Sequence, residues 1–186
     1  MSKAKGNALD HTKFLSDEER KYLASLIERY HESDNPFRKT SFRDSLLIEV
    51  AMKTGIRAQE LLNLRKEDLL LKNKTLFIRA LKHGVNREMP LDFQLFQRLK
   101  RQVSEATGKL LFDLSYSQLN RVWAQYRPNQ NKTFHCLRHT FAIWLFKKTK
   151  NLRIVQTALG HKDYQNTLIY LDFVNNTSEL KKAILG

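Results

Sequence analysis

Six side chains spread along the sequence have the chemistry needed to cut a phosphodiester without a metal ion. Displacement at phosphorus adds negative charge to the non-bridging oxygens, which cations and hydrogen-bond donors must hold. Arginine suits this task because its guanidinium is always charged and binds two oxygens at once. A general acid must protonate the departing 5′ oxygen, and a nucleophile must keep the cut strand attached. The candidates, in chain order, are Arg57, Lys82, His135, Arg138, His161 and Tyr170.

The surrounding sequence predicts where these side chains lie. The string Thr-Gly-Ile-Arg places Arg57 two residues after a helix-ending glycine. His135 and Arg138 are three positions apart and therefore share one face of a helix. His161 follows a Leu-Gly pair at the end of another helix, and Lys82 stands at the tip of the second strand of a hairpin.

The order and surroundings of these residues resemble the active-site signature of the tyrosine recombinase, or phage integrase, family. The resemblance runs from about Leu15 to Phe173. The matching strings are Thr54-Gly55-Ile56-Arg57 with Glu60 and Leu61, His135-x-Leu137-Arg138-His139-Thr140-Phe141-Ala142, Leu159-Gly160-His161, and Thr167-x-x-Tyr170. The resemblance implies the integrase catalytic-domain fold. It also implies a site-specific recombinase that cuts and rejoins DNA through a covalent 3′-phosphotyrosine, with no metal, ATP or other cofactor.

The resemblance gives roles to the charged clamp and the nucleophile. Arg57 and Arg138 would hold the non-bridging oxygens, and Glu60 would orient neighbouring basic groups without touching DNA. Tyr170 would attack phosphorus and become linked to the 3′-phosphate, which leaves a free 5′-hydroxyl. These roles require the side chains to converge around one phosphate, so we expect the Tyr170 ring not to be buried.

The resemblance also assigns the proton transfers. Lys82 would be the general acid for the 5′-hydroxyl, carried by a mobile hairpin, and Arg79 and Arg87 are its nearest competitors. His135 and His161 would hydrogen-bond the phosphate or assist proton transfer at the tyrosine.

Taken singly, several of these residues have ordinary structural explanations. Tyr170 could be a half-buried tyrosine on a helix, and Arg57 could simply pair with Glu60. His161 could stabilise a helix end through the helix dipole. Only the combination of residue types, order and context favours the catalytic interpretation.

A metal site is the main alternative for the histidines. His135 and His139 lie four positions apart, a spacing that can place two ligands on one metal ion. No third ligand stands in a recognised pattern, and no glycine-rich phosphate loop is present. We therefore expect no metal and no cofactor, and a structural role for His139.

The composition favours a nucleic-acid partner. The sequence has 33 Lys and Arg against 19 Asp and Glu, a formal net charge of +14, which predicts binding to double-stranded DNA. No apolar run reaches the about 18 residues of a membrane-spanning helix, and residues 1–10 lack the apolar segment of a signal peptide. Cys136 is the sole cysteine, which excludes a disulfide. We expect a cytoplasmic, DNA-associated protein without a membrane partner.

Hydrophobic periodicity predicts a mainly α protein with a small three-stranded antiparallel β-sheet. Ser16 and Glu19 form a capping box, Ser41, Asp92 and Asn151 cap later helices, and Gly55 and Gly160 end others. The expected helices start or run at 16–30, 41–54, 58–64, 92–107, 117–126, 136–148, 151–159, 163–170 and 178–185, and the strands at 69–71, 75–81 and 87–91. Expected core residues of the 136–148 helix include Phe141, Trp144, Leu145 and Phe146.

The domain prediction has three parts. Residues 1–14 form a flexible arm or linker, residues 15–174 the catalytic domain, and residues 175–186 a C-terminal helix that can pack on a neighbouring subunit. Family members commonly carry a core-binding domain before the catalytic one. The resemblance therefore implies a homo-oligomer, a tetramer on DNA, in the full-length context.

Two other functions stay open. One is a type IB topoisomerase that relaxes DNA with related chemistry, and the other is a non-catalytic DNA-binding module derived from a recombinase. The strings around Arg57 and His135 favour a recombinase over a topoisomerase, and the complete residue set disfavours a pure binding module.

A basic cluster lies outside the matching strings. It consists of Lys147, Lys148, Lys150 and Arg153. The cluster is either a solvated face or a set of phosphate contacts away from the active site.

Overall fold

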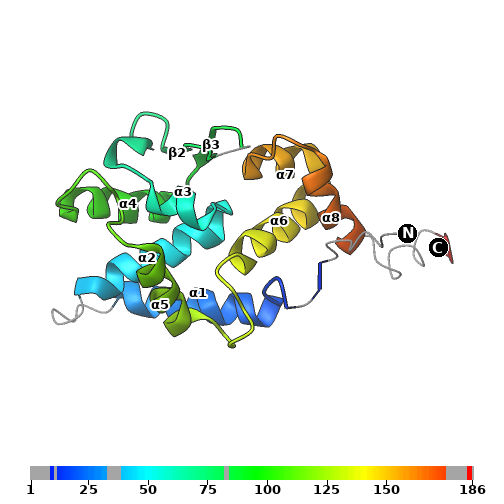
Figure 1. The fold of residues 1–186 in the computed structure, drawn as a ribbon, viewed down its shortest axis with the longest axis horizontal. Helices are drawn as coiled ribbons and strands as arrows, with labels where there is room; N and C mark the ends of the chain where they lie inside the picture. Colours follow the sequence, from blue (N-terminus) through cyan, green and yellow to red (C-terminus); the bar gives the residue numbers. More distant parts are fainter. Residues whose placement is uncertain (1–8, 11, 33–38, 82–83, 175–183, 186) are drawn as a thin grey trace.

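Helices dominate the fold, and a small sheet lies along one edge (Figure 1). The computed structural model describes residues 9–10, 12–32, 39–81, 84–174 and 184–185. The elements are α1 (Asp17–Glu32), α2 (Lys39–Thr54), α3 (Ala58–Leu62), η2 (Lys66–Asp68), β1 (Leu69–Leu70), β2 (Thr75–Ile78), β3 (Arg87–Pro90), α4 (Phe93–Glu105), α5 (Tyr116–Tyr126), α6 (Cys136–Thr149), α7 (Leu152–Leu159) and α8 (Gln165–Val174). The predicted fold class is confirmed.

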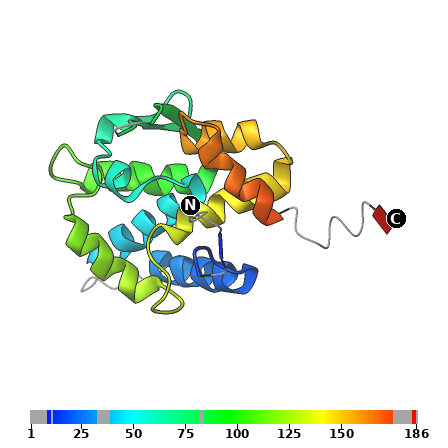
Figure 2. The same ribbon diagram turned by 45° about the vertical axis from the view of Figure 1, so that its right-hand side comes forward.

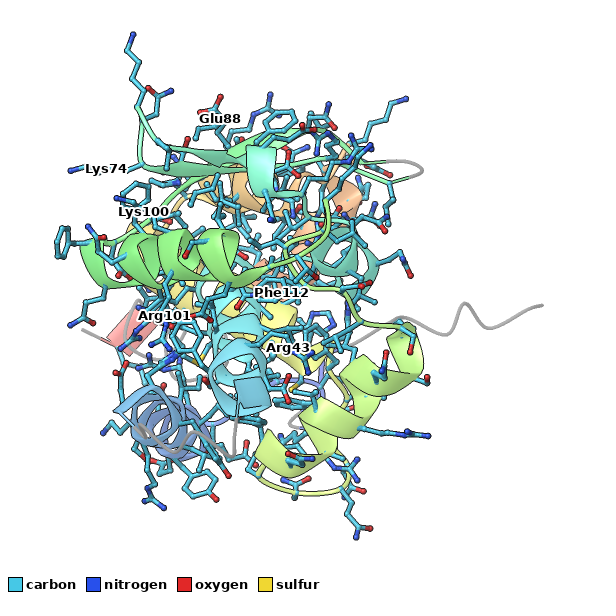
Figure 3. The ribbon with its side chains drawn as sticks, turned by 90° about the vertical axis from the view of Figure 1, so that its left-hand side faces the viewer. Arg43, Lys74, Glu88, Lys100, Arg101 and Phe112 are labelled. Carbon is cyan, nitrogen blue, oxygen red and sulfur yellow. The ribbon has the colours of Figure 1, made fainter. Side chains whose placement is uncertain are left out.

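Helix α2 forms the centre of the core. Every residue from Ser45 to Ala51 is at most 1% exposed, as expected for a helix surrounded by other elements. Helices α1, α4 and α6 pack against it. Phe112, which follows α4, is also fully buried, and Figure 3 shows it in the interior while Lys74 projects outward from the sheet.

A buried carboxylate joins the helices on one side of this core. Glu49 Oε2 lies 3.0 Å from His31 Nε2, and Glu49 Oε1 lies 2.9 Å from both Lys53 Nζ and Arg98 Nη1. Burial raises the pKa of Glu49, but these hydrogen bonds and positive charges outweigh it and lower the pKa to about 2. The cluster ties α1, α2 and α4 together.

The sheet has the order β1-β2-β3, and both strand pairs are antiparallel. Leu76 and Ile78 of β2 and Met89 of β3 point into the core, in the alternation that the sequence predicted. Strand β2 ends earlier than predicted because the side chain of Asn86 accepts the backbone N–H of Ala80 at 2.8 Å, in place of a strand partner.

The predicted caps at three helix starts are confirmed. Ser16 N donates to Glu19 Oε2 at 2.9 Å, and Glu19 N donates to Ser16 Oγ at 3.1 Å. The side chain of Asp92 accepts Leu95 N at 2.9 Å, and that of Asn151 accepts Arg153 N at 2.9 Å. These contacts depend only on neighbouring residues, so the sequence was sufficient to find them.

Some boundaries differ from the prediction. Helix α2 begins at Lys39, so Ser41 lies inside the helix and the prediction that it is the cap was wrong. Nothing between Lys39 and Ser41 breaks a helix, which lets α2 start earlier. Helix α8 runs to Val174, beyond the predicted end at Tyr170.

The outer face of α6 was also predicted incorrectly. Phe141 and Phe146 are buried, but Trp144 is 40% exposed. The ammonium of Lys148 lies 5.2 Å from the centre of the Trp144 ring, a cation–π contact that stabilises the indole at the protein surface.

The ends of the chain are described in part. Phe14 is 9% exposed and packs in the core, and Leu15 N donates to Thr140 Oγ1 at 2.8 Å. The expected helix at 178–185 falls mostly outside the described residues. Of this segment the structure describes Ile184 and Leu185, which are helical and are 72% and 77% exposed. Among the helices that the structure describes, none has the length and apolar character to cross a membrane.

Candidate active site

Arg138 connects the segments that carry the other candidates. Its Nη1 donates to the carbonyl of Gly55 at 2.7 Å, and its Nη2 donates to the carbonyl of Leu159 at 2.8 Å. Gly55 lies two residues before Arg57, and Leu159 lies two residues before His161. One guanidinium, only 2% exposed, therefore brings together three motifs that are far apart in the sequence.

The glycine before Arg57 sets the direction of the chain. Gly55 ends α2 in the left-handed region with φ +61°, and a Cβ there would lie 2.4 Å from Cδ1 of Phe141. A side chain at this position is therefore excluded by both conformation and space. Arg57 then takes the N-cap position of α3 in an extended conformation, at the mouth of the site.

Glu60 binds the basic groups around it. Its Oε1 accepts Arg57 Nη1 at 3.0 Å, and its Oε2 accepts Arg57 N at 3.1 Å and Arg87 Nη2 at 2.8 Å. Burial raises the pKa of Glu60, but Arg87 and Arg57 outweigh it and hold that pKa below its usual value. The carboxylate contacts both guanidiniums, as the interpretation of Glu60 as an orienting residue requires.

The turn that carries His161 packs on the β2–β3 hairpin. Gly160 has φ +64°, and Val85 N donates to its carbonyl at 3.1 Å. An isolated β-bridge pairs Gly84 with His161. A Cβ on Gly160 would lie 2.6 Å from the carbonyl oxygen of Val85, so the hairpin approaches this closely only because the residue is glycine. Lys82, which the sequence predicts at the tip of the hairpin, lies outside the described residues.

Both candidate histidines are predominantly neutral at pH 7. The pKa of His161 falls to about 3 because of burial and the charges of Arg138 and Arg57. Its Nδ1 lies 2.9 Å from Thr167 Oγ1, which fixes the ring. His135 remains accessible to solvent, and partial burial, Arg138 and Arg57 lower its pKa as well.

Tyr170 is buried, contrary to the prediction. It is 1% exposed, and its Oη lies 3.0 Å from His139 Nδ1. Helix α8 packs against α6 and α7 (Figure 2). This packing places the phenol on the side chain of His139. Burial raises the pKa of Tyr170 to about 12, even though Arg138 and Arg57 are close enough to oppose that shift. The nucleophile candidate thus lies beside the arginines but is covered.

His139 is the residue whose role the sequence interpretation missed. Burial, His135 and Arg138 lower its pKa to about 4, so the neutral imidazole accepts the hydrogen bond from the Tyr170 hydroxyl. The rings of His135 and His139 lie 4.7 Å apart, edge to face. The available signal was position, because His139 follows Arg138 directly and stands one helical turn after His135.

The two competitors of Lys82 are engaged elsewhere. Arg79 pairs with Asp68 and, at 3.1 Å, with Glu67. Arg87 is 6% exposed and pairs with Glu60. Among the described residues, no group of three or more His, Cys, Asp or Glu side chains is placed to hold a metal ion.

Comparison with known proteins decides the family. Residues 12–176 match the phage integrase family. The chain belongs to that family. It is 32% identical over 186 aligned residues to the tyrosine recombinase XerH of Campylobacter jejuni, an alignment that covers 92% of this chain and 51% of XerH. The chain thus spans about half the length of that curated relative.

Solved structures of family members share the fold. A post-cleavage complex of the XerH site-specific recombinase with a palindromic difH substrate superposes with a TM-score of 0.73 at 29% identity, covering 98% of this chain and 54% of that one. The catalytic domain of bacteriophage HP1 integrase has a TM-score of 0.63 at 21% identity, covering 92% of this chain and 94% of that one. The described fold is that of an integrase catalytic domain.

The basic cluster lies at the opposite end of α6 from the integrase site. Lys147 and Lys148 occupy its last turn, about 20 Å along the helix from His135. Arg153 donates to Gln156 Oε1 at 2.8 Å. Lys147 and Lys148 are therefore too far along the helix to bind the same phosphate as the residues at its start.

A largely apolar groove borders this cluster. Its volume is about 820 Å³, and its walls come from α1, α2, β3, α4, α6 and α7. The apolar part of the lining includes Met52, Met89, Trp144, Leu145 and Ile154. Trp144 and Ile154 are 40% and 45% exposed, so the groove presents apolar surface to solvent.

Proposed function

We propose that this chain is the catalytic domain of a tyrosine recombinase that cuts and rejoins double-stranded DNA at specific sites through a 3′-phosphotyrosine at Tyr170. The observation that carries the proposal is the position of Arg138, whose guanidinium holds the Arg57 and His161 segments around one site. The XerH relative, solved in a complex with its difH substrate, supports DNA as the substrate. A protein with this substrate works where the DNA of the cell lies, which we take to be the cytoplasm.

The clamp stabilises the charge that develops during cleavage. Arg57 and Arg138 bind the two non-bridging oxygens, while His135 and His161 donate hydrogen bonds to them. Burial lowers the pKa of Arg138 to about 9, and the neighbouring Arg57 and Arg87 add to this shift, so a bound anion would stabilise the charged guanidinium. A phosphate diester supplies the missing negative charge, and its transition state supplies more.

The chemical step exchanges one phosphoester for another. The Tyr170 oxygen forms a bond to phosphorus and passes its proton to the neutral imidazole of His135, while the bond from phosphorus to the 5′ oxygen breaks. Lys82 protonates the departing 5′ oxygen from the hairpin that packs on Gly160 and His161. Attack by a 5′-hydroxyl reverses the exchange, so rejoining needs neither ATP nor a metal ion.

Cleavage also requires Tyr170 to leave its resting position. The phenol donates to His139 and is screened from solvent, so it cannot attack a phosphate while this hydrogen bond persists. We propose that α8 shifts when DNA fills the clamp, which frees the oxygen for in-line attack.

The test is covalent capture on a suicide substrate. A pool of randomised duplexes, each nicked so that the cleaved fragment diffuses away, is incubated with the protein without a metal ion, and the protein–DNA adducts are recovered under denaturing conditions and sequenced. We expect adducts that share a sequence, and none from Tyr170→Phe. Wild-type protein that binds the duplexes but forms no adduct would indicate a non-catalytic binding module. Relaxation of a supercoiled plasmid without recombination products would indicate a topoisomerase.

We further propose that residues 1–14 are an arm or linker anchored to the core by Phe14, that residues 15–174 are the catalytic body, and that residues 175–186 pack on a neighbouring subunit. Ile184 and Leu185 are highly exposed, and the groove beside Trp144 offers an apolar surface for them. On DNA such contacts would join four copies in a ring. Sedimentation of the DNA complex should show a tetramer for the full chain and a smaller species for a chain ending at residue 174, and equal sizes would contradict the proposal.

A further inference from the structure

Arg87 lies within the arginine cluster but is closed off from solvent. It is 6% exposed, and both terminal nitrogens point to one carboxylate, with Nη2 2.8 Å from Glu60 Oε2 and Nη1 3.4 Å from Glu60 Oε1. Its charge is thus paired with the Glu60 carboxylate, whereas the terminal nitrogens of Arg138 donate to backbone carbonyls. The place of Arg87 beside Arg57 and His161 therefore needs another explanation.

Glu60 divides its charge between two guanidiniums. Its side chain is fully buried and accepts Arg57 Nη1 at 3.0 Å in addition to Arg87. The Arg57 side chain remains 34% exposed, so it is the one of the two that can also reach a ligand. Because Arg87 neutralises much of the carboxylate, Arg57 keeps charge available for a phosphate.

Arg87 also packs on the turn that carries His161. A Cβ on Gly160 would lie 2.9 Å from Arg87 Nη1 and 3.2 Å from Arg87 Cδ, so the arginine fills the space that the glycine leaves. Two residues earlier in the hairpin, Val85 N donates to the Gly160 carbonyl at 3.1 Å. The same side chain thus contacts the support of Arg57 and the support of His161.

We propose that Arg87 is a positioning residue of the active site. By pairing with Glu60 it frees Arg57 for the scissile phosphate, and by packing on Gly160 it fixes the β2–β3 hairpin against the His161 turn. The inference rests on the proposed function for its catalytic readout, but its effect on Arg57 is independent of any reaction.

Removal of the Arg87 charge should pull Arg57 towards Glu60, and removal of the Glu60 charge as well should release it. In Arg87→Met, Glu60 is left with Arg57 as its remaining guanidinium and draws it away from the phosphate, and we expect single-turnover cleavage of the nicked duplex to fall by about 100-fold. Arg87→Lys keeps the charge but loses the bidentate contact with Glu60, so its cleavage rate should lie between those of wild type and Arg87→Met. Adding Glu60→Gln to Arg87→Met removes the excess negative charge and should restore at least tenfold of the lost rate.

The controls separate catalysis from folding. Arg98→Met breaks another buried arginine–glutamate pair, on the α1–α2–α4 side, and Arg79→Met removes the other arginine of the hairpin. Rates are measured below the melting transition of every variant. Both controls should cleave within threefold of wild type. The proposal would be overturned if the rate loss of the double variant equalled the product of the losses in Arg87→Met and Glu60→Gln. It would also be overturned if Arg98→Met lost as much cleavage rate as Arg87→Met.

DNA affinity and side-chain NMR complete the test. In a Tyr170→Phe background that also lacks the Arg57 guanidinium through Arg57→Met, adding Arg87→Met should leave the salt dependence of duplex binding unchanged, because Arg87 contacts no phosphate, whereas a slope smaller by about one would show a direct contact. In free protein, the Arg57 Nε–H resonance should shift in Arg87→Met and return towards its wild-type position in the double variant. An Arg57 signal that does not move in Arg87→Met would overturn the inference about Arg87. A wild-type protein that forms no DNA adduct would instead refute the proposed function, and the NMR result would still decide the role of Arg87.

Discussion

The phosphate clamp and the nucleophile are held in opposite ways. The clamp is fixed before DNA arrives, because Arg138 donates to two backbone carbonyls and Glu60 is completely buried between arginines. The nucleophile is withheld, because Tyr170 is covered and its hydroxyl donates to His139. In the proposed mechanism, this difference prepares the site to stabilise charge and prevents cutting until α8 moves.

The electrostatics of the two regions agree with this division. Burial and neighbouring arginines lower the pKa of Arg138 to about 9 and that of His161 to about 3, so the empty clamp favours an anion. Burial raises the pKa of Tyr170 to about 12, so the covered phenol keeps its proton at neutral pH. Binding of a phosphate would balance the positive charge of the clamp, and movement of α8 would expose the Tyr170 phenol.

Replacement of Arg138 should have the largest effect, because it breaks the fixed region. Arg138→Lys keeps a positive charge but cannot bind two carbonyls and two phosphate oxygens with one planar group. We expect single-turnover cleavage to fall by about 100- to 1000-fold. Arg98→Lys, in the remote ion-pair cluster, serves as the matched control and should stay near wild type. An Arg138→Lys variant within threefold of wild type would show that the clamp is not built as described.

Replacement of His139 should weaken the restraint on the nucleophile. His139→Phe removes the acceptor of the Tyr170 hydroxyl, and the loss of one hydrogen bond of about 1 kcal/mol should speed single-turnover cleavage by about fivefold. His139→Gln retains an acceptor and should change the rate less. A slower His139→Phe variant would mean that the imidazole helps the reaction, for example by taking the phenol proton.

Acidification should loosen the site through its histidines. The pKa values of about 4 for His139 and about 3 for His161 lie below the ordinary 6.5, so below pH 6.5 the unfolded chain binds protons that the folded chain refuses. This contribution to stability is complete above pH 6.5 and declines as pH falls towards 4. Urea denaturation at pH 7.5 and pH 5 should show the decline, and His139→Gln should reduce it. Equal declines in both proteins would argue against these shifts.

Charge reversal in the basic cluster should have the smallest effect. Lys147 and Lys148 lie about 20 Å along α6 from His135. In the double variant Lys147→Glu, Lys148→Glu the cleavage rate of a bound duplex should therefore not change. If the cluster contacts phosphates, the salt dependence of duplex binding should weaken by up to about two counterions. An unchanged slope would identify the cluster as a solvated face.

Sequence reasoning succeeded where local geometry decides the outcome. The caps at Ser16, Asp92 and Asn151 and the helix-ending glycines depend on residues a few positions apart, and the structure confirms them. The fold class followed from periodicity in the same way. The order and context of the motif residues were sufficient to identify the family.

The errors concern tertiary contacts. Trp144 was expected in the core, but α6 is apolar on several faces, and only the packing of neighbouring helices decides which face is covered. The burial of Tyr170 on His139 depends on where α8 lies, which no local pattern encodes. Arg87 was considered only as a competitor of Lys82, because its partner Glu60 is distant in sequence. Lys82 stays a prediction.

The most direct test of this account is the identity of the residue that carries the DNA. The adduct trapped on a nicked duplex is digested with nuclease and trypsin, and the peptide of residues 163–181 is sequenced by mass spectrometry. We predict a nucleotide 3′-phosphate on Tyr170, the covered tyrosine. A phosphate on Tyr164, which is 41% exposed in the same peptide, or on any other residue would contradict the account.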